Sequence, residues 1–207
     1  MEDFKKIDEI NLPDKRNLLF GSFNTETGKF DRLTLERIYR AVELVELSER
    51  APESVRSQFN VAKNLAVYTW YSYSFNQISE LKAYSCVEMA LKDRLGKHKY
   101  GFRGLIKKAV TLGLIQDKGF EVVREPSDSN EYSEGLIDII PNLRNELAHG
   151  STALHPGAVF TLQWCSDFIN QLYENDSDKS VSRRYTWRLC LRCSVSTLLT
   201  CGRENGI

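Results

Sequence analysis

The chain has 207 residues, a mass of 23.8 kDa, a hydrophobic fraction of 42% and equal numbers of basic and acidic side chains, 28 of each. This composition excludes wholesale disorder, because it supplies enough apolar residues for a core, and the length fits one domain with appendages. The zero formal net charge excludes a strong overall basic field, so any contact with RNA would need a local basic groove.

Residues 1–60 are expected to form an N-terminal arm followed by one helix. The first 30 residues carry weak patterns and turn signals, and apolar positions between Leu33 and Leu47 then recur at a period near 3.6. The charged start lacks the apolar run of a secretory signal, and the most apolar window, residues 61–75, is too short to cross a bilayer. We therefore expect a cytoplasmic protein that does not associate with membranes.

The dominant predicted element lies between Pro52 and Gly96, a stretch of 43 residues with neither glycine nor proline. Its apolar residues recur at spacings of three and four, which predicts one long amphipathic, aromatic-rich helix. Two helices joined by a break that the sequence does not mark would fit equally well. The aromatic run YTWYSYSF is interpreted as a wide buried face in preference to a base-stacking platform.

Three further helices are predicted over residues 102–115, 133–150 and 156–175, and a polar connector precedes the second of them. Pro141 lies inside that second helix and indicates either a kink or the first turn of a new helix. No alternating strand pattern of useful length appears. The predicted class is all-α, a mostly antiparallel bundle of four to five core helices with residues 61–175 as its domain.

Residues 176–207 are interpreted as a linker and a basic, cysteine-containing tail. Cys190 and Cys193 show half of a zinc-ribbon spacing, but Cys201 is the one further thiol there and no histidine follows, so no metal site is expected. Cys86 and Cys165 fall on apolar helix faces and are expected in the core. Because phosphate-binding loops and metalloenzyme motifs are also missing, no cofactor is expected.

The stretch RNELAHG, residues 144–150, supports two interpretations. In the first, it is an ordinary helix end, in which cationic side chains face the carbonyl terminus and Gly150 takes the left-handed position after the helix. In the second, it supplies the acid–base groups of a nuclease. Imidazole transfers protons near neutral pH, and a guanidinium matches phosphate oxygens in pairs.

Arg144 and His149 would not share one face of an ideal helix, because five residues correspond to a rotation of about 140°. They would converge if the helix ended at Ala148 and swung His149 off the axis. Alternatively, a two-fold dimer would place two copies of each residue around one groove. The residues alone leave both routes open.

The stretch resembles the motif of the HEPN (higher eukaryotes and prokaryotes nucleotide-binding) family, with Arg144, Asn145 and His149 at the three motif positions. A helix carrying Glu88 at the family's common acidic position is similar to the first core helix of that family. A short middle helix and a closing helix also match. The resemblance covers roughly residues 61–175.

This resemblance implies a usually dimeric helical bundle that cleaves RNA without a metal ion, as a bacterial toxin or phage-defence component with an antitoxin or other protein partner. Arg144 would stabilise the pentacovalent phosphate, His149 would transfer protons, and Asn145 would orient the phosphate or the histidine. Glu88 and His155 are auxiliary candidates, and His155 either points into the same cleft or caps a turn. The alternative is a non-catalytic dimeric scaffold that binds a protein partner.

Overall fold

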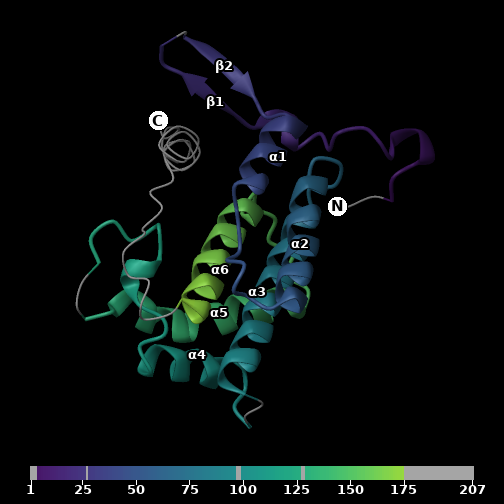
Figure 1. Ribbon diagram of the computed structural model, residues 1–207. Coiled ribbons are helices and arrows are strands. Elements are labelled where there is room, and N and C mark those ends of the chain that lie inside the picture. Colours follow the sequence, from purple (N-terminus) through teal and green to yellow (C-terminus); the bar gives the residue numbers. More distant parts are fainter. Residues whose placement is uncertain (1–3, 27, 97–98, 127–128, 175–207) are drawn as a thin grey trace, which may run out of the picture.

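The computed structural model describes residues 4–26, 28–96, 99–126 and 129–174, which are mostly helical (Figure 1). The helices are α1 (Leu35–Glu43), α2 (Glu53–Tyr68), α3 (Phe75–Leu95), α4 (Phe102–Thr111), α5 (Glu131–Ala148) and α6 (Ala158–Tyr173). This content is consistent with the predicted all-α class. Within the described residues, no helix is both long and apolar enough to span a lipid bilayer.

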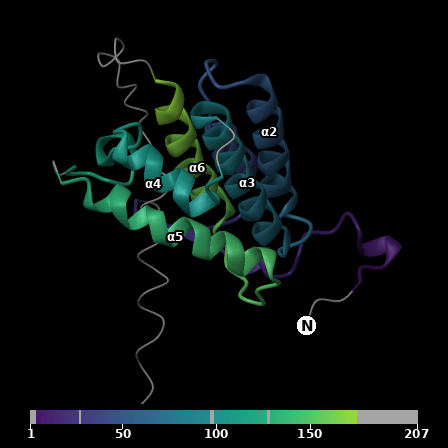
Figure 2. The same ribbon diagram turned by 90° about the horizontal axis from the view of Figure 1, so that it is seen from below.

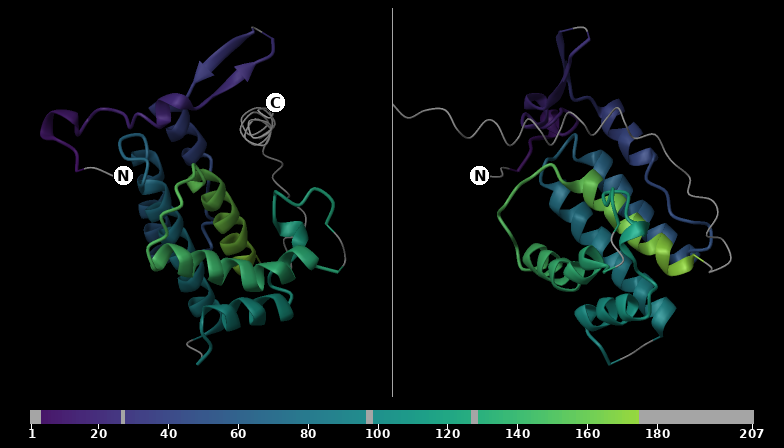
Figure 3. Two further views of the ribbon diagram at one scale, coloured as in Figure 1. Left: turned by 180° about the vertical axis from the view of Figure 1, so that it is seen from behind. Right: turned by 90° about the vertical axis from the view of Figure 1, so that its left-hand side faces the viewer.

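Helix α3 is the centre of the fold, since it contacts α2, α4, α5 and α6. Helices α2, α3 and α6 lie side by side, and α4 and α5 run across one end of this layer (Figures 2 and 3). Buried residues on α3 recur at the helical spacing, as Ala83, Val87, Ala90 and Leu91, all fully shielded from solvent. Neighbours on several sides explain why α3 is apolar around much of its circumference.

The stretch between Pro52 and Gly96 is two helices, so the prediction of a single long helix is wrong and its stated alternative is confirmed. Helix α2 ends at Tyr68, and residues 69–74 form a turn before α3 begins. The hydroxyl of Thr69 donates to the carbonyl of Ala66 at 2.6 Å and thereby competes with the helical pattern.

The N-terminal arm stabilises this turn from outside. The side-chain amide of Asn17 donates to the carbonyls of Thr69 (2.7 Å) and Trp70 (3.1 Å). The carboxylate of Asp14 accepts from the amide of Tyr73 at 3.0 Å, and the amide of Asp14 donates to the carbonyl of Trp70. Because these partners come from a distant segment, no local glycine or proline was needed to break the helix.

A β-hairpin interrupts the region that the sequence indicated as irregular. Its strands, β1 (Gly21–Asn24) and β2 (Lys29–Arg32), pair antiparallel and project from the end of α1 (Figure 1). Arg37 of α1 anchors the hairpin by donating to two carbonyls of β2 and to a hydroxyl of β1. The expectation that no strands form is therefore wrong for this short segment, where each strand has only four residues.

The connector before α5 is less polar than its composition indicated. Phe120 is buried and packs on Trp164 and Phe168, so the connector contributes to the core. Asp117 accepts hydrogen bonds from the amide (2.8 Å) and hydroxyl (2.6 Å) of Ser133 in the first turn of α5. These contacts fix the start of the helix that carries the motif.

Candidate functional site

The end of α5 is a Schellman motif, in which the chain reverses and satisfies the last carbonyls of the helix. His149 takes the cap position and Gly150 follows with a φ of +87°. The amides of Gly150 and Ser151 donate to the carbonyls of Leu147 (3.4 Å) and Glu146 (3.1 Å). The predicted left-handed glycine after the helix is confirmed, and this turn fixes where the backbone places His149.

Pro141 is buried inside α5, which continues as one helix through it. Proline lacks an amide hydrogen, so the carbonyl of Ile137 loses its usual helical donor. Of the two outcomes that the sequence allowed, a new helix starting at Pro141 is excluded. The proline ring lies against the same pocket as the motif arginine.

Arg144 reaches from α5 toward α3, and its guanidinium is incompletely paired. Its Nη2 lies 3.6 Å from Oε2 of Glu88, and its Nη1 donates to Oδ1 of Asn145 at 3.4 Å. Its Nε is buried and has no hydrogen-bond partner among the described residues. Glu88 makes a closer contact to Lys92, at 2.6 Å. The Nη groups of Arg144, held by one long ion pair and one long hydrogen bond, therefore keep donor capacity for a ligand.

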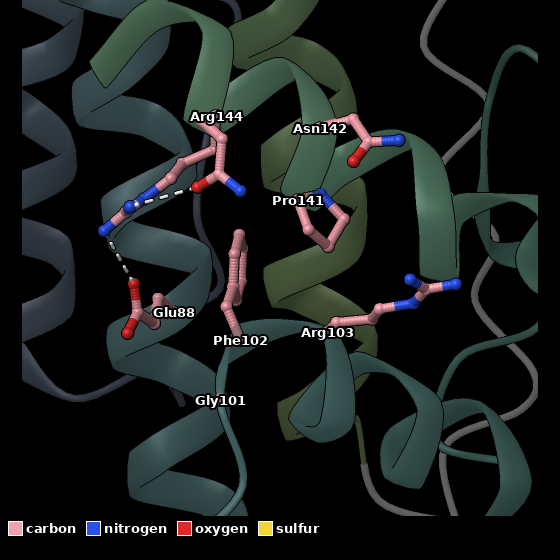
Figure 4. A pocket seen from close by; sticks show the side chains of 8 residues that line it. Glu88, Gly101, Phe102, Arg103, Pro141, Asn142 and Arg144 are labelled. Atoms are coloured by element: carbon pink, nitrogen blue, oxygen red, sulfur yellow. Dashed lines mark hydrogen bonds and ion pairs between the residues drawn. The ribbon is translucent and has the colours of Figure 1, made fainter. Parts of the chain in front are cut away.

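A pocket of about 380 Å³ lies between α3, α4 and α5, and we call it the α4–α5 pocket. In Figure 4 the ring of Phe102 stands between Arg144 and Pro141, and the Arg103 guanidinium lies beyond it on the far side. The lining residues are Glu88, Gly101, Phe102, Arg103, Pro141, Asn142, Arg144 and Asn145. Two guanidinium groups and two amides around an aromatic ring suit an anionic ligand with a planar group.

His149 is exposed and does not belong to the residues that line the α4–α5 pocket. Helix α5 does end at Ala148, as one predicted route to convergence required. Within one protomer, however, Arg144 and Asn145 share a pocket that His149 does not enter. Of the two routes to a combined site, the two-fold dimer is the one that this geometry leaves open.

His155 lies on the loop between α5 and α6 and contacts α3, and it is not among the residues that line the α4–α5 pocket. Its Nδ1 lies 3.5 Å from Oε1 of Glu80, whose side chain is only 3% exposed. Burial raises the pKa of Glu80 to about 8. A Cβ atom on Gly157 would lie within 2.7 Å of both side chains, so the glycine makes room for this contact. Glu80 was not anticipated from the sequence.

Gln77, one turn before Glu80, binds the same loop. Its side-chain amide donates to the carbonyls of Ser151 (3.0 Å) and Ala153 (2.6 Å). These contacts, together with the Glu80–His155 pair, attach the segment that follows His149 to the start of α3. The loop is otherwise largely exposed.

Three pocket residues, Phe102, Arg103 and Asn142, were missed in the sequence. For Phe102 and Arg103, the available signal is the pair of a ring and a cation at the first turn of a helix, preceded by Gly101. The apolar spacing of that helix directed attention to its buried face and its two lysines instead. Asn142 follows the buried Pro141, and this position has no motif of its own.

The cysteine predictions divide between described and undescribed residues. Cys86 and Cys165 are buried free thiols as expected, and burial raises the pKa of Cys86 to about 11. Cys190, Cys193 and Cys201 lie outside the described residues. Within the described ranges, no group of three or more histidine, cysteine, aspartate and glutamate side chains is placed to hold a metal ion.

Comparisons with protein-family models, with curated proteins and with solved structures found no match. The resemblance to the HEPN family thus depends on the residues of the motif and its flanking helices, and it stays a prediction.

Proposed function

We propose that this chain is a metal-independent endoribonuclease of HEPN type, a mostly antiparallel helical bundle that acts in the cytoplasm. The observation that carries the proposal is the position of Arg144. Its guanidinium lines an open pocket together with Asn145, is held by only a long ion pair and a long hydrogen bond, and belongs to the helix that the exposed His149 caps.

The chemistry needs three groups around one phosphate. A base removes the proton from the 2′-hydroxyl, which attacks the phosphorus, and an acid protonates the 5′-oxygen as the P–O bond breaks. The products are a 2′,3′-cyclic phosphate and a free 5′-hydroxyl. Arg144 stabilises the charge of the pentacovalent phosphate, His149 transfers protons, and Asn145 orients the phosphate or the imidazole.

A homodimer completes this site. Because His149 does not enter the α4–α5 pocket of its own protomer, a second copy related by a two-fold axis brings a histidine to the pocket. Glu88 is the auxiliary group nearest to Arg144. His155, which contacts Glu80, supports the loop that follows His149. A toxin or phage-defence role with an antitoxin or other protein partner completes the proposal.

Incubation of the purified protein with single-stranded RNA and transfer RNA in EDTA tests this function. We expect cleavage by the wild type that leaves cyclic-phosphate ends, and loss of at least about 100-fold in rate for Arg144→Ala and for His149→Ala. Arg40→Ala, which removes an exposed arginine of α1, is the matched control and should cleave normally. Circular dichroism checks that each variant is folded.

Two results would contradict the proposal. Cleavage that persists in His149→Ala would assign the activity to another group or to a contaminant carried through the same purification. Absence of cleavage by a folded wild-type dimer on every substrate would remove the enzyme from consideration.

The second candidate is a non-catalytic scaffold, and exposed apolar side chains favour it. Phe23 and Phe30 form a cross-strand pair on the hairpin, each more than half exposed, and Tyr68 at the end of α2 is 53% exposed. Tyr73, from the same aromatic run, is buried, so only part of that run fits a contact surface. Loss of partner binding on Phe23→Ser, with Arg144→Ala silent, would support this candidate.

A further inference from the structure

The α4–α5 pocket contains the groups that bind a nucleotide chain: an aromatic ring with a cation on each side of it. In Figure 4 the Arg144 guanidinium lies on one side of the Phe102 ring and the Arg103 guanidinium lies on the other. In a single strand of RNA, each nucleoside lies between two charged phosphates and carries one planar base. Aromatic rings stack on unpaired bases of any sequence, and guanidinium groups bind phosphate oxygens in pairs.

The two arginines are held loosely enough to accept a phosphate. Arg103 forms an ion pair with Asp138, but both side chains are at least 60% exposed, and such surface pairs contribute little. Arg144 lies 3.6 Å from Glu88, a separation longer than a hydrogen bond. Neither cation is committed to a buried, fully bonded partner.

Helix α4 adds a weaker contribution from its first turn. Its N-cap is Gly101, which has no side chain to cap the amides, and the first turn faces the pocket through Gly101, Phe102 and Arg103. Helix N-termini favour anions. The side-chain amide of Asn142 supplies a further donor, on the same side of the Phe102 ring as the Arg103 guanidinium (Figure 4).

We propose that the α4–α5 pocket binds single-stranded RNA, with one unpaired base stacked on Phe102 and the neighbouring phosphate bound by Arg103. This inference builds on the proposed function, in which Arg144 contacts the phosphate that is cleaved. Arg103 and Phe102 then define the nucleotide next to the cleavage point. The substrate class is RNA with unpaired bases, because a duplex keeps its bases stacked on one another and does not offer one to the ring.

Binding is measured by fluorescence anisotropy of a short, labelled single-stranded RNA of mixed sequence, in EDTA and in the His149→Ala background. We expect a duplex of the same strand to bind at least about 10-fold more weakly. Phe102→Leu removes the ring but keeps an apolar side chain, and it should weaken binding about 10-fold without changing the salt dependence. Arg103→Gln should weaken binding and reduce the slope of log K against log salt by about one.

Lys107→Gln is the matched control, since it removes a positive charge from the same helix at an exposed position outside the pocket. An effect equal to that of Arg103→Gln would overturn the proposal, as would equal affinity for duplex and single strand. If Phe102→Leu lowers the thermal midpoint, Arg103→Gln alone decides, because that side chain is exposed. No change in either variant also overturns it.

The binding assay separates this inference from the nuclease proposal. Single-strand binding that depends on Phe102, in a protein that does not cleave RNA, would support the binding site and contradict the nuclease proposal. Cleavage that depends on His149 but does not change on substitution of Phe102 or Arg103 would support the nuclease proposal and contradict this binding site.

Discussion

Helix α3 carries three carboxylates, and two of them, Glu80 and Glu88, lie near the two ends of the segment that runs from Arg144 to His155. Glu80 has a side chain only 3% exposed, lies 3.5 Å from His155, and its Oε1 accepts no hydrogen bond from the described residues. Glu88 is 20% exposed, is bound to Lys92 and lies beside Arg144. Two identical residues on one helix thus have different surroundings.

Burial, not residue type, decides what each of these two carboxylates contributes. Because burial raises the pKa of Glu80 to about 8, this group is mostly neutral at neutral pH and acts as a polar packing contact for the loop after His149. Glu88 acts through charge on the guanidinium of Arg144. One carboxylate supports the position of the loop, and the other moderates the electrostatics of the pocket.

The largest effect is expected for Glu80→Gln and its dependence on pH. The pKa of Glu80 is raised in the folded state, so the unfolded chain binds fewer protons between its ordinary pKa of 4.5 and about 8. Across this range the wild type should lose about 1.4 kcal/mol of unfolding free energy for each pH unit, several kcal/mol in all. The glutamine variant lacks this loss.

Urea unfolding at about pH 5 and about pH 9 measures the difference. Relative to the wild type, Glu80→Gln should gain stability as the pH rises. Parallel stability curves for the two proteins would show that the carboxylate of Glu80 is not protonated preferentially in the fold. A variant that loses relative stability as the pH rises would show that the folded state favours the ionised carboxylate of Glu80.

A smaller effect is expected for Gln77→Ala, which tests whether the first turn of α3 supports the loop that follows His149. Loss of the two hydrogen bonds to Ser151 and Ala153 should cost about 1–2 kcal/mol of unfolding free energy. It should also slow RNA cleavage about 10-fold or more, because the segment beside His149 is less well positioned. Gln58→Ala, whose side chain contacts Lys82 away from this loop, should leave cleavage unchanged.

The smallest effect on stability is expected for Glu88→Gln, at most about 1 kcal/mol, because its ion pairs are partly exposed. RNA binding should become several-fold tighter, since a negative charge beside Arg144 is lost. Filter binding measures this change. Glu36→Gln removes a carboxylate from an exposed pair with Arg40 on α1 and serves as the control. Weaker binding by Glu88→Gln would instead assign this residue to the orientation of Arg144.

The sequence predicted the elements whose signals are local and missed those that depend on distant partners. The apolar spacing located α4, α5 and α6 to within a few residues, and Gly150 marked the end of α5. The break after Tyr68 was not marked by a glycine or a proline. The hairpin was also missed, because four-residue strands are too short for an alternating pattern to stand out.

The candidate site divides in the same way. Arg144 and Asn145 were identified from a motif, and the structure places both in one pocket. The separation of His149 from this pocket follows from the course of the chain at the end of α5. Phe102 could not be assigned to the pocket from spacing alone, because a partly buried aromatic at a helix start is usually read as core. Only the position of Phe102 near Arg144 in the folded chain shows that it also lines the pocket.

The contacts between the N-terminal arm and the turn after α2 have a kinetic consequence. Asn17 and Thr69 are 52 positions apart. Helices α2 and α3 are close in sequence, but the carbonyl of Thr69 in the turn between them receives the Asn17 hydrogen bond only when a long loop closes. Closure of such loops slows folding relative to purely local helix pairing. The rate at which this helical protein folds should therefore depend on an arm that contains no α-helix among its described residues.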